Sequence, residues 1–149
     1  MIGLTSVTPA QADTDPTYKF EQVLNPGKCL VVPNPAWPDV AMGSCDSGYA
    51  RWRYYDGTGQ LLNIGSHRCL KADGRKVTVQ ICNRDDANQR NWNASTNNTL
   101  PELGGITKHY ATGDSWRFLV GWTGGSVSLE NPVDLQGEPQ KYLFWLRPA

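Results

Sequence analysis

The residues of this chain with the most distinctive chemistry are its four cysteines, which fall into two similarly built segments. Cys29 and Cys45 flank the first segment, and Cys69 and Cys82 flank the second. Four cysteines can pair in three ways. Because copied units normally keep their bonds internal, the repetition favours Cys29–Cys45 and Cys69–Cys82. We expect each disulfide to close a short loop and to stabilise the fold by about 3 kcal/mol.

A metal site and a catalytic site are both poorly supported. Zinc sites use closely spaced pairs such as Cys-x-x-Cys, and the two histidines, His67 and His109, also lack ligand spacing. The sequence has no Gly-x-Ser-x-Gly elbow, no His-Glu-x-x-His motif and no P-loop. We therefore expect no metal, no cofactor and no enzymatic activity.

The charges of the chain balance, with 14 basic and 14 acidic residues. Such a balance gives no electrostatic footprint for nucleic acid or for an anionic membrane. The densest basic patch, Lys71, Arg75 and Lys76, is interrupted by Asp73 and is explained by a solvated hairpin tip. No segment is long and apolar enough to predict a membrane-spanning helix.

Short apolar runs predict β-strands. Examples are Lys28–Val32, Leu61–Ile64 and Val77–Ile81, and turn signals such as Asn25-Pro26-Gly27 and Asp73-Gly74 bound them. No window shows the sustained 3.6-residue period of an amphipathic helix. A chain of this length can bury a core of its own. We expect one all-β domain, a barrel or a sandwich, over residues 13–149.

One block of sequence occurs twice, at a spacing of about 40 residues. Its elements are a Cys-Leu pair, an apolar strand ending in the second cysteine, and a tryptophan. They are Cys29-Leu30, Val40–Cys45 and Trp52 in the first copy, and Cys69-Leu70, Val77–Cys82 and Trp92 in the second. Repeats of this length are copies of one supersecondary unit that bury their apolar faces against each other.

A third, fainter copy follows without cysteines. Phe118-Leu119-Val120 stands where the Cys-Leu segments stood, Val127 follows at a comparable distance, and Gln140–Phe144 supplies an aromatic strand. The pattern predicts repeats over residues 18–56, 57–99 and 100–149. The alternative is that residues 97–149 form an unrelated β tail.

Residues 1–12 resemble a targeting segment. The stretch is uncharged and mildly apolar, and it ends in Ala10-Gln11-Ala12, a small-x-small pattern typical of signal-peptidase sites. We interpret it as the remnant of a signal peptide, with Asp13 as the first mature residue; the alternative is an ordinary flexible leader. Since disulfides persist in oxidising compartments, the cysteines also predict a secreted, extracellular protein.

With these residues together, the chain resembles a divergent member of the ricin-type β-trefoil lectins. The resemblance runs from Phe20 to Arg147, and its strongest stretch is Cys82–Gln89 followed by Trp92. It implies a six-stranded barrel capped by three hairpins with pseudo-threefold symmetry. The strand aromatics are then packing residues of the central core, namely Trp52, Trp92, Tyr142 and Phe144.

The family's sugar-binding pattern is incomplete in this chain. A galactose-type site uses a carboxylate shortly after the first cysteine of a repeat and an aromatic ring shortly before the second. The carboxylate position reads Val31, Lys71 and Val120 in the three copies, and none of these side chains can accept a hydrogen bond. The aromatic position reads Gly43 and Gln80 in the first two. The resemblance therefore implies a lectin scaffold with degenerate sugar sites.

Five residues remain candidates for carbohydrate contact. Asn88 and Gln89 match the family's Asn-Gln pair, although the glutamine of this motif also serves the fold by bonding backbone near the core. Asp73 lies two residues beyond the missing carboxylate. Trp37 and Trp122 stand in hairpin loops, where an indole ring can stack on a sugar or fill a partner's pocket. The alternative for each tryptophan is packing over its own hairpin.

These features favour two functions of different classes. The first is a secreted, non-catalytic, lectin-like module that binds a glycan or glycoconjugate. The second is a trefoil that has lost sugar binding and contacts a secreted protein partner, as a toxin-complex subunit, an inhibitor or an adhesion protein. The loss of all three carboxylates favours the second function, and the loop tryptophans are compatible with both.

Overall fold

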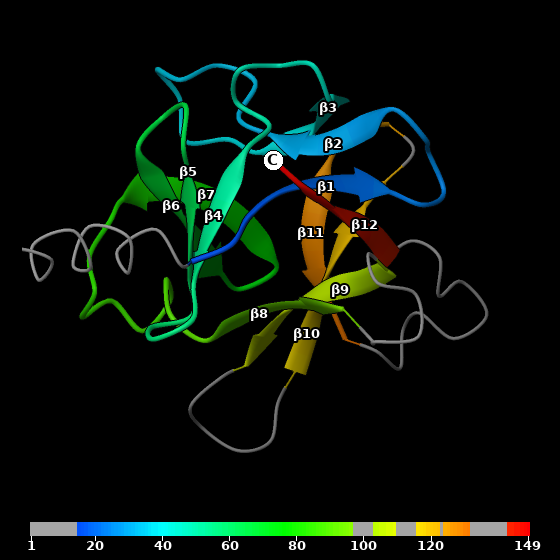
Figure 1. Cartoon of the computed structure of the whole chain (residues 1–149). Coiled ribbons are helices and arrows are strands. Elements are labelled where there is room, and N and C mark those ends of the chain that lie inside the picture. The colour runs from blue at the N-terminus through cyan, green and yellow to red at the C-terminus, as the bar shows by residue number, and fades with distance from the viewer. Residues whose placement is uncertain (1–14, 97–102, 110–115, 123, 132–142) are drawn as a thin grey trace, which may run out of the picture.

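The computed structural model describes residues 15–96, 103–109, 116–122, 124–131 and 143–149, and every regular element in these ranges is a β-strand (Figure 1). The predicted leader over residues 1–12 and Tyr142 lie outside them. The strands are β1 (Thr17–Gln22), β2 (Lys28–Val31), β3 (Ala41–Ser44), β4 (Trp52–Tyr55), β5 (Gln60–Asn63), β6 (Arg68–Asp73), β7 (Lys76–Ile81), β8 (Trp92–Thr96), β9 (Leu103–His109), β10 (Trp116–Gly121), β11 (Val127–Glu130) and β12 (Leu143–Pro148).

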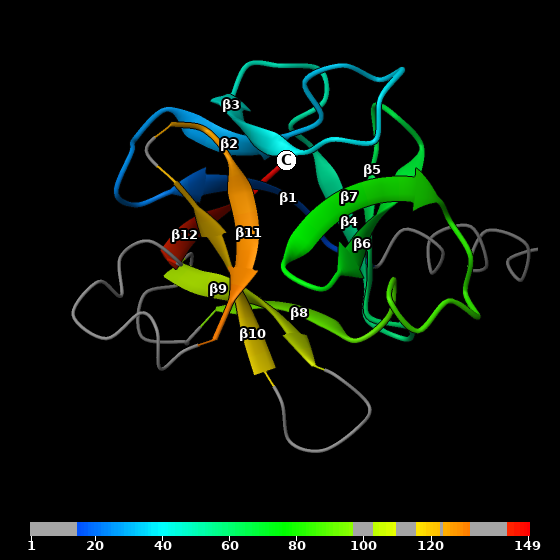
Figure 2. The same ribbon diagram turned by 180° about the vertical axis from the view of Figure 1, so that it is seen from behind.

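Six strands form the barrel and six form hairpins on it (Figures 1 and 2). Antiparallel ladders join β4 to β5 and β1, β1 to β12, β12 to β9, and β9 to β8. The chain before β5 meets the start of β8 through Asn91 N–H to Thr58 O (3.3 Å) and Trp92 N–H to Gly59 O (2.8 Å). The hairpins are β2–β3, β6–β7 and β10–β11. The predicted β-trefoil architecture is confirmed.

Each run of four strands is one repeat, and each repeat buries a leucine and an aromatic side chain in the shared core. The pairs are Leu30 with Trp52, Leu70 with Trp92, and Leu119 with Phe144. In repeats one and two the indole N–H also donates to the leucine's backbone oxygen, at 2.9 and 3.1 Å. Because repeat three places its residues in the same way, the alternative of an unrelated tail is wrong.

The three hairpins are joined to one another in a ring of equivalent hydrogen bonds. In each of these bonds, a backbone N–H in the second strand of one hairpin donates to a carbonyl oxygen in the tip of the neighbouring hairpin. The bonds are Met42 to Gly125, Val79 to Pro38, and Leu129 to Arg75, each 2.8 Å long. Every hairpin tip therefore lies beside the hairpin of another repeat, and its side chains become part of that repeat's surface.

A buried polar side chain occupies the same position in the first strand of each repeat. Each lies opposite the core aromatic of the barrel strand paired with it: Gln22 faces Phe144, Asn63 faces Trp52, and Lys108 faces Trp92. Each donates to a backbone oxygen of another repeat: Gln22 to Gly121, Asn63 to Tyr49, and Lys108 to Ala87. Since an unpaired buried polar group is costly, these bonds fix how neighbouring repeats sit together.

The disulfides Cys29–Cys45 and Cys69–Cys82 are those that the repeat predicts. Each closes a hairpin within its own repeat, and no free cysteine remains. Within the described ranges, no helix is long and apolar enough to cross a membrane, and no group of His, Cys, Asp or Glu is arranged to hold a metal ion.

We expect Trp52→Phe to lower the free energy of unfolding by about 1–3 kcal/mol, because the core loses a buried hydrogen bond to Leu30. Urea unfolding followed by far-ultraviolet circular dichroism measures the change. Trp37→Phe, at an exposed loop position, is the matched control and should leave stability unchanged. Equal stability of Trp52→Phe and the parent protein would contradict a structural role for this bond.

Candidate functional site

The strand position at which the family carries its sugar-binding carboxylate is sealed in repeat one. Val31 is 4% exposed and packs with Cys29 and Ala50 in a small cluster beside the disulfide. A Cβ atom added at Gly43 would lie 2.8 Å from a methyl carbon of Val31, so the valine fills the space above the opposite strand. This position offers no polar group and no opening to a ligand.

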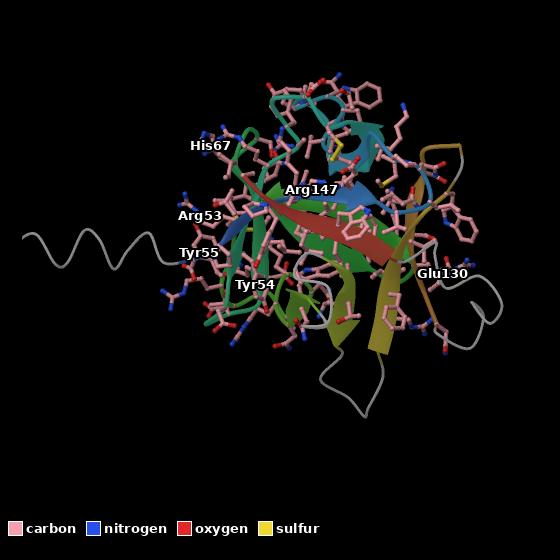
Figure 3. The ribbon with its side chains drawn as sticks, turned by 45° about the vertical axis from the view of Figure 1, so that its right-hand side comes forward. Arg53, Tyr54, Tyr55, His67, Glu130 and Arg147 are labelled. Carbon is pink, nitrogen blue, oxygen red and sulfur yellow. A yellow bond between two sulfur atoms is a disulfide. The ribbon has the colours of Figure 1, made fainter. Side chains whose placement is uncertain are left out.

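In repeat three the same region holds bonds within the protein. Val120 is fully buried, and nearby Glu130 accepts two hydrogen bonds of 2.8 Å from Arg75, which comes from the tip of repeat two (Figure 3). Ser128 donates to Glu130 at 2.6 Å and accepts from the Trp122 indole at 2.8 Å. Burial acts to raise the pKa of Glu130, but the bonds from Ser128 and Arg75 outweigh it and lower that pKa.

Repeat two instead presents polar side chains to solvent. Lys71 Nζ lies 3.0 Å from Asp86 Oδ2, and the two side chains are 32% and 20% exposed. The Asn88 N–H donates to Asp86 Oδ1 at 2.9 Å, and the Asn88 carbonyl accepts from Ala72 N–H at 2.9 Å. The Asn88 N–H and Lys71 together lower the pKa of the Asp86 carboxyl. The loop between β7 and β8 is thus held against β6 by these bonds. The Asp86 carboxylate is charged, and Asn88 is exposed.

Gln89, the other half of the predicted Asn-Gln pair, is turned into the protein. Its side chain is buried, and its Oε1 accepts from Asn83 N–H at 2.8 Å and from Gln60 Nε2 at 3.3 Å. Its Nε2 donates to Ile81 O at 2.9 Å. Because protein groups occupy both ends of the amide, Gln89 positions the loop that carries Asn88 and does not itself face a ligand.

Asp73 lies at the end of β6, where Lys76 is its cross-strand partner. Both side chains are exposed at the hairpin tip. Alternate residues of a strand point to the same face, so Asp73 and Lys71 share the outer face of β6. The structure therefore places Asp73 at the rim of the repeat-two surface.

Trp37 extends from the tip of repeat one and is 61% exposed. Two residues later, Asp39 forms a β-bridge with Thr78, and Thr78 is the cross-strand partner of Lys71. The tip of repeat one therefore lies along the outer edge of β7, next to the polar surface of repeat two. The predicted alternative, in which Trp37 packs over its own hairpin, does not agree with this exposure.

Trp122 is separated from this surface. Its ring is half-buried and lines a hollow of about 360 Å³ between repeats one and three. A further hollow of about 560 Å³ is lined by Tyr55 and His67, which lie on the opposite side of the view in Figure 3 from Glu130. None of the five candidate residues lines that second hollow. The candidates thus divide into two sets. Asn88, Gln89, Asp73 and Trp37 lie on or beside repeat two, and Trp122 lies apart from them. We call Lys71, Asp86 and Asn88, the polar side chains exposed on repeat two, the repeat-two group.

Two features of the site were not predicted from the sequence. One is the Lys71–Asp86 ion pair, because Asp86 approaches β6 only through the path of its loop. The other is Lys108, a fully buried lysine whose Nζ donates to Ala87 O at 3.1 Å, beneath the same loop. Burial lowers the pKa of Lys108, and the nearby Asp86 charge partly opposes this shift. The threefold position that Lys108 shares with Gln22 was the available signal.

We expect the Asp86 carboxyl to titrate below the ordinary aspartate value of about 3.9, and Lys71→Gln to move its pKa upward. Because the pKa of Asp86 is lower in the folded protein than in the unfolded chain, its carboxylate stabilises the fold at pH values above the ordinary aspartate pKa. This contribution is lost as the pH falls through the folded-state pKa. Carboxyl-carbon NMR titration measures it, with Lys28→Gln in repeat one as the matched control. An ordinary pKa in the parent protein would contradict the pairing.

One family profile matches the sequence. A profile of the ricin-type beta-trefoil lectin domain matches residues 16–103. Comparison with curated protein sequences gives no significant match.

Several solved structures share the fold at low sequence identity. The β-trefoil lectin of the Vibrio vulnificus hemolysin/cytolysin, with N-acetyl-D-lactosamine bound, has a TM-score of 0.68 at 16% identity, covering 92% of this chain and 98% of that one. The cytolethal distending toxin from Actinobacillus actinomycetemcomitans gives 0.66 at 14% identity, covering 89% and 91%. The earthworm R-type lectin C-half in complex with GalNAc gives 0.63 at 14%, covering 90% and 99%. These matches establish the β-trefoil, and because the profile spans more than half of the sequence, the chain belongs to the ricin-type β-trefoil lectin domain family.

Proposed function

We propose that the chain is a secreted, non-catalytic carbohydrate-binding module whose sugar site lies on repeat two. Membership of the lectin family supports carbohydrate binding in general. The choice of repeat rests on one observation, the exposed Asn88 beside the Lys71–Asp86 pair. In the other two repeats, the position of Lys71 is taken by the buried valines Val31 and Val120, and we therefore regard those two sugar sites as degenerate.

The repeat-two group has the donors and acceptors that sugar hydroxyls require. Each Asp86 oxygen accepts one bond within the protein, and a carboxylate has about four lone-pair sites, so each oxygen can accept a hydroxyl as well. The Lys71 ammonium has three N–H donors and Asn88 has a side-chain amide. Asp86 therefore replaces, from the loop, the carboxylate that the family supplies from the strand.

Trp37 provides the apolar part of the proposed site. Sugar rings carry an apolar face that packs on aromatic side chains, and an exposed indole at the edge of β7 gives such a surface. It comes from repeat one, whereas the family's aromatic comes from the same repeat as the carboxylate. Asp73, at the rim, is placed to contact a second residue of a longer glycan.

The proposed location outside the cell rests on the two disulfides. Disulfide bonds persist in oxidising compartments, and here both hairpin disulfides are formed and no cysteine is free.

A protein partner is the second candidate, and exposed apolar residues favour it. Ile81 is 82% exposed at the end of β7, and Trp37 is 61% exposed beside the same strand. Large exposed apolar side chains that cluster are typical of contact surfaces between proteins. This candidate needs Ile81, which the sugar site does not use.

We expect the full chain to bind a subset of neutral galactose- or N-acetylgalactosamine-containing glycans on an array. Asn88→Ala and Trp37→Ala should each weaken the best glycan about tenfold by isothermal titration calorimetry, since each removes about 1.4 kcal/mol of contact. Asn93→Ala changes an exposed asparagine of β8 and is the matched control.

Two results would overturn the proposal. One is the absence of glycan binding at millimolar ligand, and the other is undiminished affinity in Asn88→Ala. A stoichiometric protein partner from culture supernatant that is lost in Ile81→Ala, but retained in Asn88→Ala, would establish the second candidate instead.

A further inference from the structure

A hollow of about 360 Å³ lies between repeats one and three, away from the repeat-two surface. One wall is the turn between β1 and β2, which carries Asn25, together with Lys28 at the start of β2. The other wall is the β10–β11 tip, which carries Trp122 and Gly125. Met42 of β3 also lines it. Figures 1 and 2 show the turn and the tip side by side from opposite directions. Its volume is in the range of small-ligand sites.

A buried amide holds the two walls together. Asn25 Nδ2 donates to Gln22 Oε1 at 3.0 Å, and Gln22 Nε2 donates to the backbone oxygen of Gly121, which immediately precedes Trp122. Gln22 is fully buried. A Cβ atom at Gly121 would lie 2.8 Å from Met42 and 3.0 Å from Gln22, so the walls approach as closely as a glycine allows. The distance between the turn and the tip is thus fixed by the core.

The Trp122 ring is also fixed in advance. Its Nε1–H donates to Ser128 Oγ at 2.8 Å, and its backbone N–H donates to Ser126 O at 2.9 Å. Gly125 closes the turn with a φ of 97°, a conformation that favours glycine, and its carbonyl bonds Met42 of repeat one. An aromatic surface that is already ordered loses little entropy when a ligand stacks on it.

Lys28 is the one ionisable residue among the described lining residues of the hollow. Lys28 is exposed at its edge and makes no ion pair with any described residue, and no acidic residue is among the described residues of its lining. The combination is an ordered indole, an amide-bearing turn and one available ammonium. An aromatic surface binds the apolar face of a pyranose ring, and an ammonium binds a carboxylate or sulfate on that ring.

We propose that this hollow is a second binding site, specific for an anionic pyranose, in which Trp122 stacks on the ring and Lys28 pairs with its acidic group. The site goes beyond the proposed function, because it shares no residue with the repeat-two group and recognises a different class of sugar.

Isothermal titration calorimetry of the full chain tests the site with four methyl glycosides: N-acetylneuraminic acid, glucuronic acid, galactose 6-sulfate and galactose. We expect at least one anionic glycoside to bind, and Lys28→Gln to weaken it about tenfold, the usual effect of removing a charge-assisted hydrogen bond. Lys28→Arg should restore most of the affinity. Trp122→Ala should abolish binding, with folding checked by circular dichroism. The carboxylated and sulfated probes distinguish the two sources of charge.

Lys71→Gln and Asn88→Ala are the matched controls and should leave affinity for the anionic glycoside unchanged. This design separates the two sites, since loss of the repeat-two site affects only the neutral glycan. Failure of all three anionic glycosides to bind at millimolar concentration would overturn the proposal. Unchanged affinity of Lys28→Gln for the anionic glycoside would also overturn the proposal. So would a loss of that affinity in Lys71→Gln that is not seen in Lys28→Gln.

Discussion

The fold depends on contacts between repeats that no single repeat can make. Three backbone hydrogen bonds of 2.8 Å join the hairpins in a ring, and they originate at Met42, Val79 and Leu129. A single repeat exposes its leucine and its core aromatic, whereas three together bury them fully. The ring also shapes the surface, because every hairpin tip is held beside another repeat and adds its side chains to the surface of that repeat.

The scaffold is symmetric and its surface chemistry is not. The tip of repeat one, which carries Trp37, lies along β7 of repeat two. The tip of repeat two brings Arg75 to Glu130 of repeat three. The tip of repeat three brings Trp122 against repeat one. Equivalent hairpin tips are thus followed by an exposed polar surface, an ion pair between Arg75 and Glu130, and a hollow. The buried side chains Gln22, Asn63 and Lys108 keep these neighbours in register.

The sequence was sufficient to predict the fold because its strongest signals come from buried residues. The Cys-Leu blocks and the tryptophans record packing and disulfide geometry, which repeat with the structure. They also correctly align Leu119 with the leucines of the cysteine-containing repeats. The same alignment sets Tyr142 against Trp52, and this part is wrong, because Phe144 lies opposite Gln22 as Trp52 lies opposite Asn63. Buried strand residues must be apolar and must recur at the spacing of the strand, and this regularity can be recognised in the sequence alone.

The candidate site could be predicted only in part, because it depends on where loops turn. The sequence identified Asn88 and Gln89 as a pair and left open whether Gln89 contacts a ligand or bonds backbone. The burial of Gln89 and the exposure of Asn88 follow from the path of their loop. Lys71 occupied the position of a missing carboxylate, and its partner Asp86 became apparent only in three dimensions. The position of the Trp37 loop beside repeat two likewise depends on the hydrogen bond from Val79 N–H to Pro38 O, which no sequence pattern indicates.

We propose that carbohydrate binds to repeat two and not to the equivalent positions of the other repeats. Backbone amide chemical shifts, followed by NMR during titration with a neutral galactoside, test it most directly. We expect the largest shifts at Ala72 and Asn88, with the amides of Val31 and Val120 unchanged. Shifts centred on Val31 or Val120, or equal shifts in all three repeats, would contradict it.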